Sequence, residues 1–110
     1  MDPRDLGIAR ARMEDLLGGT PEENAAVVRR VLQGEEGPVR DIVLLNTAAG
    51  IVTYDLVRAP ETVDRPILER LRNAFETAAT AIDSGAALSK LDAWVSSTQR
   101  HSLVETPALP

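Results

Sequence analysis

The sequence contains no cysteine and few aromatic residues. Without cysteine, a disulfide framework, a thiolate nucleophile and a thiolate metal site are excluded, and a cytoplasmic location is the expectation. Only 3% of the 110 residues are aromatic, and Trp94, Tyr54 and Phe75 are the three of them. The apolar residues are largely Ala, Val and Leu, a composition that favours helices over sheets. An all-α chain is therefore the first expectation.

Positive charge is also scarce, because the net charge is −5 and the isoelectric point is near 4.8. Phosphate binding needs a cationic surface, so we expect no nucleic-acid partner and no binding to anionic membranes. The longest apolar run, residues 41–52, is shorter than the roughly 20 residues of a membrane span. The polar start, Met1-Asp2-Pro3, is not that of a signal peptide. These features predict a soluble protein of at most one small domain.

Five helical segments and no strand are predicted, after an extended start over residues 2–7. The first segment, residues 9–17, ends at Gly18-Gly19 because glycine tolerates a helix C-cap conformation. The second begins at Thr20-Pro21-Glu22-Glu23, a capping box with proline at the first helical position, and ends at Gly34. Its expected apolar face contains Ala25, Val28 and Leu32.

The apolar run 41–52 predicts a third helix, from about residue 39 to residue 54, because it is too long for a buried strand. This helix is apolar on nearly all sides, and we expect that the rest of the chain does not cover it fully. Gly50 costs about 1 kcal/mol relative to Ala inside a helix, which we interpret as close approach of a neighbouring helix. Asn46 is expected to bond to the backbone of a neighbouring helix end or loop, because a buried amide needs partners.

Residues 56–66 contain two prolines and alternating charges, which predict a loop. A fourth helix follows, with a stripe spaced 3, 4, 3 and 4 residues apart: Leu68, Leu71, Phe75, Ala78 and Ile82. Ser84 is expected to cap a fifth helix, whose apolar positions are Leu88, Leu91, Trp94 and Val95. We accordingly divide the chain into a helical part, residues 1–97, and a disordered tail, residues 98–110.

No pattern of catalytic, substrate-binding or metal-binding residues emerges, and none is assigned. Neither GxGxxG nor GxxxxGK[ST] occurs. Gly18-Gly19 precedes a helix N-terminus, where an anion can bind, but Glu22 and Glu23 already occupy that positive end. His101 has no acid at a fixed spacing, so a catalytic triad has no support.

The remaining polar candidates have structural interpretations. Neighbouring residues on a helix point about 100° apart, so neither Glu22-Glu23 nor Glu35-Glu36 converges on one metal ion. Asn24 lies one turn into its helix, and we expect its side chain to form hydrogen bonds with a loop. The apolar residues of the fourth helix are interpreted as part of the core or of an interface, and not as a ligand-binding site.

Several segments, taken in order, resemble the closing part of the anthranilate phosphoribosyltransferase family, within the phosphoribosyltransferases related to nucleoside phosphorylases. The resemblance covers roughly residues 3–95. Two departures are local: Thr47 stands where the family usually has Ala, and residues 55–73 are longer and more charged than in many members. The segments that carry the resemblance are Pro3-Arg4-Asp5-Leu6-Gly7, Leu16-Leu17-Gly18-Gly19-Thr20-Pro21-Glu22-Glu23-Asn24-Ala25, Gly34, Gly37-Pro38-Val39-Arg40-Asp41-Ile42-Val43-Leu44-Leu45-Asn46-Thr47-Ala48-Ala49 and Ala81-Ile82-Asp83-Ser84-Gly85-Ala86-Ala87.

The resemblance implies a parent enzyme of tryptophan biosynthesis that transfers a phosphoribosyl group from phosphoribosyl pyrophosphate to anthranilate. Such an enzyme has an N-terminal helical domain, a larger α/β domain and an active site between them, where magnesium shields the phosphates. The family's G-T-G-G-D loop, K-H-G-N segment and magnesium-binding Asp-Glu pair do not occur here. We therefore expect a C-terminal scaffold fragment of the α/β domain, without a cofactor of its own and not catalytic by itself.

Two alternatives remain at this stage. The chain could be a stand-alone helical interaction or oligomerisation module, such as a homodimer that associates through its apolar helices. A DNA-binding helix-turn-helix, built from the first two helical segments, is the other, and the acidic net charge argues against it. In the fragment hypothesis the partner is the missing N-terminal part of the parent enzyme.

Overall fold

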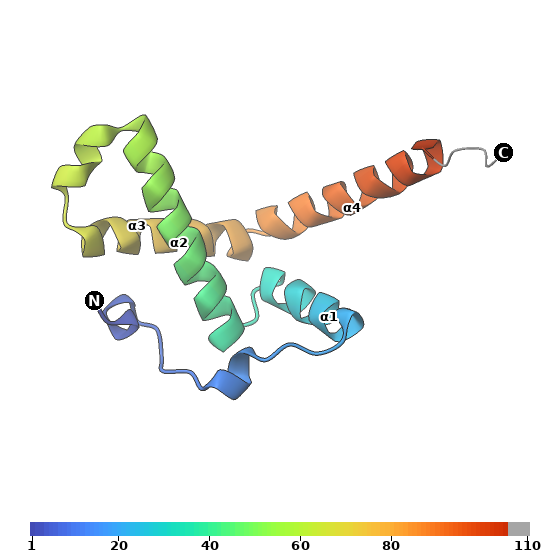
Figure 1. Ribbon diagram of the computed structural model, residues 1–110, viewed down its shortest axis with the longest axis horizontal. Coiled ribbons are helices and arrows are strands. Elements are labelled where there is room, and N and C mark those ends of the chain that lie inside the picture. The colour runs from blue at the N-terminus through green and yellow to red at the C-terminus, as the bar shows by residue number, and fades with distance from the viewer. Residues whose placement is uncertain (106–110) are drawn as a thin grey trace.

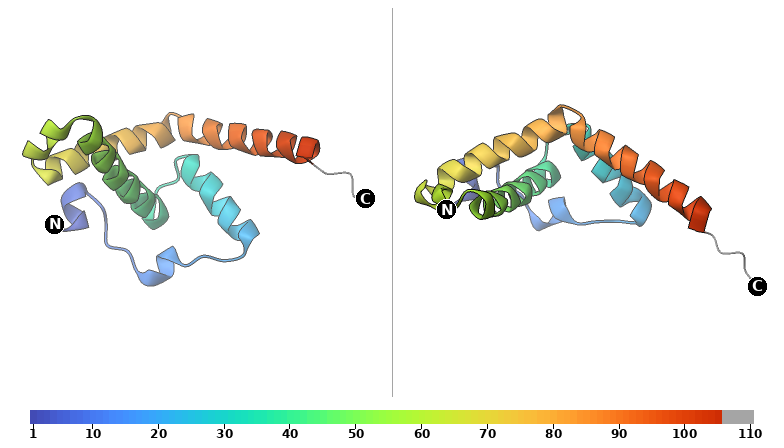
Figure 2. Two further views of the ribbon diagram at one scale, coloured as in Figure 1. Left: turned by 45° about the horizontal axis from the view of Figure 1, so that its top comes forward. Right: turned by 90° about the horizontal axis from the view of Figure 1, so that it is seen from above.

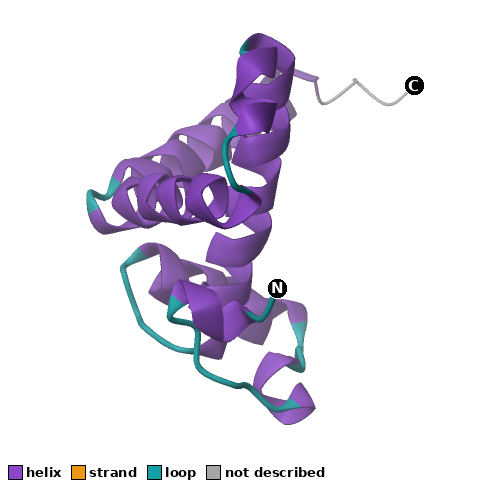
Figure 3. Cartoon of the chain, turned by 90° about the vertical axis from the view of Figure 1, so that its left-hand side faces the viewer, coloured by secondary structure: helices purple, strands orange, loops and turns teal. Residues whose placement is uncertain are grey.

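The computed structural model describes residues 1–105, in which helices are joined by loops (Figures 1 and 3). This part of the chain contains four α-helices, three short 3-10 helices and no strand, which confirms the all-α prediction. None of these helices is long and apolar enough to cross a membrane. The α-helices are α1 (Pro21–Leu32), α2 (Pro38–Arg58), α3 (Ile67–Asp83) and α4 (Ala86–Glu105), and the 3-10 helices are η1 (Pro3–Leu6), η2 (Met13–Leu16) and η3 (Pro60–Asp64).

The start of α1 follows the predicted capping box. The Glu23 amide donates to Thr20 Oγ1 at 3.2 Å, and the Thr20 amide donates to Glu23 Oε2 at 3.1 Å. Asn24 satisfies the preceding loop as expected, because its side chain accepts from the Gly19 amide and donates to the Gly19 carbonyl. The predicted apolar face of α1 is only partly right: Leu32 packs against the core, but Val28 is 48% exposed and Ala25 is also exposed, while the buried residue is Val31.

The core lies mainly between α2 and α3, which cross each other (Figure 1). Two clusters of buried side chains fill this contact, and the half-buried Ile51 and Phe75 pack against both. The first cluster lies towards α1 and the second towards η1. Their buried members are Val31, Leu44, Ala78 and Ile82 in the first and Ala48, Val52, Leu71 and Ala74 in the second.

Four elements differ from the sequence predictions. Within the start expected to be extended, Pro3–Leu6 form η1. Residues 9–12 are not helical, and only η2 forms within the predicted helix 9–17. In the predicted loop 56–66, α2 continues to Arg58 and η3 follows. Helix α4 runs to Glu105 and so includes residues 98–105, which the sequence analysis assigned to the tail. The rest of the predicted tail, residues 106–110, lies outside the described residues.

The arrangement is open. The radius of gyration is 17.7 Å, whereas a compact domain of this length has about 13 Å. The chain exposes 8256 Å², against about 6,000 Å² for a compact monomer of its mass. Figure 2 shows one reason, since α4 extends away from the α2–α3 pair in both turned views.

Part of the excess surface is apolar, as expected for the run 41–52. Ile42 is 40% exposed and Tyr54 58% exposed on α2, and Trp94 is 66% exposed on α4. The chain therefore leaves α2 partly uncovered, in agreement with the sequence expectation.

We predict that Leu44→Ala lowers the free energy of unfolding by about 2–5 kcal/mol, because it removes a side chain that is only 2% exposed and leaves a cavity. The matched control, Ile42→Ala on the exposed side of the same helix, should cost less than about 1 kcal/mol. Urea unfolding followed by circular dichroism measures both values. Equal losses for the two variants would contradict the placement of the core.

Candidate functional site

The strongest polar contact between helices is the ion pair of Arg40 and Asp83. Arg40 lies in the first turn of α2, and Asp83 is the last residue of α3. Nη1 and Nη2 of Arg40 donate to Oδ1 and Oδ2 of Asp83 at 2.8 and 2.9 Å. The Arg40 side chain is only 11% exposed. Two parallel bonds of this kind fix geometry as well as charge, so the pair joins the start of α2 to the end of α3.

Helix dipoles do not explain the position of either residue. A helix N-terminus favours acids and a helix C-terminus favours bases, yet Arg40 is at an N-terminus and Asp83 at a C-terminus. Their mutual bond offsets both unfavourable positions. Sequence reasoning assigned no pairing to these two residues, and this reversal of the usual charge placement is the signal that could have revealed it.

Two of the segments that carry the family resemblance meet at this ion pair. In Gly37-Pro38-Val39-Arg40, Gly37 has φ 142° and Pro38 begins α2, which places Arg40 in the first turn of the helix. In Asp83-Ser84-Gly85, Ser84 Oγ accepts from the Ala86 amide at the start of α4, at 3.3 Å. Gly85 makes the turn with φ 84°. Both motifs therefore have a structural role in this chain.

The ion pair also shifts the acid–base equilibria of its members. The hydrogen bonds from Arg40 hold the pKa of Asp83 below its usual value of 3.8, and those to Asp83 raise the pKa of Arg40. Both groups are therefore charged at neutral pH, and neither is suited to transfer a proton there.

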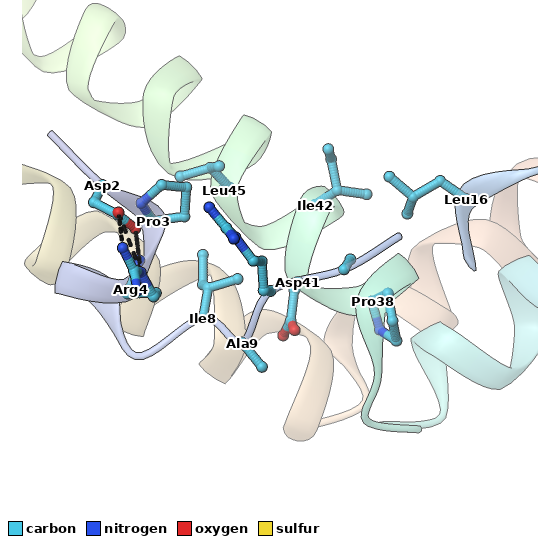
Figure 4. A pocket seen from close by; sticks show the side chains of 12 residues that line it. Asp2, Pro3, Arg4, Ile8, Ala9, Leu16, Pro38, Asp41, Ile42 and Leu45 are labelled. Carbon is cyan, nitrogen blue, oxygen red and sulfur yellow. Dashed lines mark hydrogen bonds and ion pairs between the residues drawn. The ribbon is translucent and has the colours of Figure 1, made fainter. Parts of the chain in front are cut away.

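A groove lies between the N-terminal segment and the first half of α2 (Figure 4). Its volume is about 320 Å³, and its apolar lining includes Ile8, Leu16 and Ile42. Two of its charged residues, Asp2 and Arg4, bond to each other at 2.7 Å, and this contact lowers the pKa of Asp2. The groove offers apolar contact and no converging set of reactive groups.

The polar residues weighed from the sequence do not come together. The positive end of α1 is occupied by Glu23, as expected. Glu35 bonds to Arg30 at 3.3 Å. His101 Nδ1 lies 2.8 Å from the Ser97 carbonyl oxygen on its own helix. These contacts are local, and none assembles a nucleophile with a base.

Two predictions for α2 are wrong. Asn46 is exposed, and its side chain has no hydrogen-bond partner among the described residues. Gly50 also faces open space, because a Cβ placed there would meet nothing within 4 Å. Both predictions failed because residues 42–54 carry no charged side chain. The sequence therefore does not indicate which side of this helix faces the core.

The magnesium implied for the parent enzyme would need oxygen ligands that converge on one point. No group of three or more His, Asp or Glu side chains that could hold a metal ion occurs in residues whose side chains are described. The donors present therefore do not fit the magnesium that the family resemblance implies for the parent enzyme, and we derive no chemistry through it.

Comparison with known proteins identifies the family. Residues 1–88 match the family described as "Glycosyl transferase family, a/b domain". The chain belongs to that family. It is homologous to part of several anthranilate phosphoribosyltransferases, while no solved structure matches it significantly.

Three relatives illustrate the extent of this similarity. The anthranilate phosphoribosyltransferase of Leifsonia xyli subsp. xyli is 60% identical over 99 residues, which cover 90% of this chain and 28% of the relative. That of Thermobifida fusca is 54% identical over 93% of this chain and 28% of the relative. The enzyme of Rhodococcus jostii is 47% identical over 89% of this chain and 26% of the relative. The chain thus spans little more than a quarter of the length of these relatives.

We predict that the ion pair makes stability depend on acid pH. The pKa of Asp83 is lower in the folded state than its usual value of 3.8, so the stabilisation is complete above that value and is lost as the pH falls through the folded pKa. The urea midpoint should therefore fall once the pH drops below that usual value. The Asp83→Asn variant should show a smaller fall of the urea midpoint with pH than the unmodified chain. At neutral pH the variant should be less stable than the unmodified chain, because it lacks the ion pair.

The matched control is Glu76→Gln, which removes one negative charge from the exposed side of α3 and leaves the ion pair intact. It should retain the acid dependence of the unmodified chain. An Asp83→Asn profile parallel to that of the unmodified chain would show that the ion pair does not stabilise the fold.

Proposed function

We propose that this chain is the C-terminal scaffold of an anthranilate phosphoribosyltransferase and has no catalytic activity by itself. The observation that carries the proposal is the 60% identity over 90% of the chain to the Leifsonia xyli enzyme of that name. The parent enzyme would transfer a phosphoribosyl group from phosphoribosyl pyrophosphate to anthranilate in tryptophan biosynthesis. We place this enzyme in the cytoplasm, in line with the absence of cysteine.

The scaffold role is supported by what the chain contains. Its best-defined polar contact, between Arg40 and Asp83, joins two helices, and both side chains are charged at neutral pH. Its buried core is aliphatic. These features stabilise the position of helices and supply no group for proton transfer or phosphate binding.

The partner in this proposal is the remainder of the same enzyme. The open shape supports it, because a chain with a radius of gyration of 17.7 Å leaves apolar helix surface without cover. In the alternative, a stand-alone oligomerisation module, a second copy of this chain would provide that cover.

A chimera tests the proposal directly. The 99 matching residues of this chain replace their counterparts in the Leifsonia xyli enzyme, and loss of anthranilate fluorescence in the presence of phosphoribosyl pyrophosphate measures transfer. We expect the chimera to retain activity within an order of magnitude of the relative, and the isolated chain to have none. The matched control is the relative lacking that segment, which should be inactive.

A folded but inactive chimera would contradict the proposed enzyme. Turnover by the isolated chain would contradict its non-catalytic role. A discrete dimer of the isolated chain, together with an inactive chimera, would favour the interaction module.

A further inference from the structure

A small cavity lies where η3 connects the end of α2 to the start of α3, on the opposite side of the molecule from α4 (Figure 1). Its volume is about 140 Å³. Its apolar part includes Val52 and Ala74, which belong to the buried core. The polar side chains that line it include those of Asp55, Arg65, Arg70 and Asn73. We call this space the η3 cavity.

Opposite charges line the η3 cavity without meeting. Asp55 comes from α2, Arg70 from α3 and Arg65 from the residues between η3 and α3. Within the described residues, no ion pair joins Asp55 to either arginine, and the side chains of Asp55 and Arg65 form no hydrogen bond. Asp55 also lies in the last turn of α2, where the helix dipole disfavours an acid. A cation beside Asp55 and an anion beside the arginines would therefore both be stabilised.

The Arg70 guanidinium is held in an orientation that suits a carboxylate. Its Nε donates to the Arg65 carbonyl at 3.0 Å, while its Nη1 and Nη2 have no acceptor in the part of the chain that the structure describes. Two parallel N–H groups of this kind match the two oxygens of a carboxylate. Arg40 uses the same two atoms to bind Asp83 in this chain. The Arg70 side chain is half-buried and already anchored, so it loses little conformational freedom on binding.

The remaining polar groups of the η3 cavity complete the donor set. The side-chain amide of Asn73 has no partner among the described residues, so it can donate to an anion. The hydroxyls of Thr62 and Thr77 already donate to the backbone carbonyls of Ala59 and Asn73. A simple anion would meet the guanidinium groups but would be repelled by the carboxylate of Asp55. A molecule with an ammonium group next to its carboxylate meets all these charges with the opposite sign.

We propose that the η3 cavity binds a small α-amino acid. The carboxylate of the ligand accepts from Nη1 and Nη2 of Arg70, with Arg65 and Asn73 beside it, and the ammonium donates to Asp55. A small side chain, such as the methyl group of alanine, lies against the apolar part of the cavity. This inference goes beyond the proposed function and does not rest on it, because every residue that it uses belongs to this chain.

A titration of the ¹⁵N-labelled chain, followed by NMR at pH 7 and constant ionic strength, tests the proposal. The probes are L-alanine and its two halves, acetate and ethylammonium. We expect L-alanine to cause saturable shifts of the Asn73 and Thr77 amides. Its half-saturation concentration should be at least about tenfold lower than that of either half, because joining the two charged groups makes the second contact intramolecular.

Two variants locate the site. Arg70→Gln and Asp55→Asn should each raise the half-saturation concentration of L-alanine at least about tenfold, because each removes one of the two ionic contacts. Asp55→Asn should also bind acetate more tightly than the unmodified chain does, since it removes the repulsive charge. The matched controls make the same charge changes away from the cavity: Arg100→Gln on α4 and Glu22→Gln on α1. Both controls should bind L-alanine like the unmodified chain.

A second arginine variant guards against a folding defect. Arg70 also bonds to the backbone of Arg65, so its replacement could loosen the loop. Arg65→Gln leaves that bond in place and should still weaken L-alanine binding. Circular dichroism establishes that each variant is folded.

Three results would overturn the proposal. The first is a folded, unmodified chain that shows no saturable response to L-alanine. The second is acetate binding as tight as that of L-alanine, which would show a site for anions alone. The third is unchanged L-alanine binding in Arg70→Gln and Asp55→Asn.

The titration is independent of the activity test. An active chimera whose matching residues, as the isolated chain, do not bind L-alanine would leave the proposed function intact and sink the amino-acid site. Binding of L-alanine by the chain, together with an inactive chimera, would support the site while the proposed function fails.

Discussion

The close contact between α2 and α3 is the constraint on which the rest of the structure depends. Ala48 on α2 is fully buried, and Ala74 and Ala78 on α3 are each 4% exposed. Small side chains at these positions let two helix backbones approach closely, with Leu44 and Leu71 filling the space on either side. The ion pair of Arg40 and Asp83 then fixes one end of the crossing. Without this contact, the other helices would have no surface on which to pack.

Helix α2 therefore has two different faces. One face is already covered by α3. The opposite face, which we call the outer face of α2, has the uncharged composition of a covered surface but lies exposed in this chain. It is formed by Val43, Asn46, Gly50, Thr53 and Val57. Hydrophobic burial drives such a face towards a partner. A scaffold in an α/β domain would account for both faces of α2, for the structural use of the two family motifs, and for the open shape.

Local rules predicted part of the fold. The Thr20–Glu23 capping box and the stripe of α3 could be read from the sequence because caps and periodicity are local signals. Residues 9–12 failed to form a helix, since a short segment without a cap or a packed face does not meet the cost of nucleation. α2 ends only at Arg58 because Pro60 restricts Ala59, whose φ of −139° is not helical. The Arg40–Asp83 pair joins residues 43 positions apart, and no local pattern specifies such a contact, apart from the reversed charge placement noted above.

A crystal structure of the chimera with the Leifsonia xyli enzyme is the most direct test of the claim that this chain is a scaffold covered by the rest of the enzyme. The account predicts that residues 42–54 remain helical, that the Arg40–Asp83 ion pair is preserved, and that residues of the relative lie within about 4 Å of Gly50 and Asn46. An outer face of α2 that contacts only water or a second copy of the same chain would contradict it.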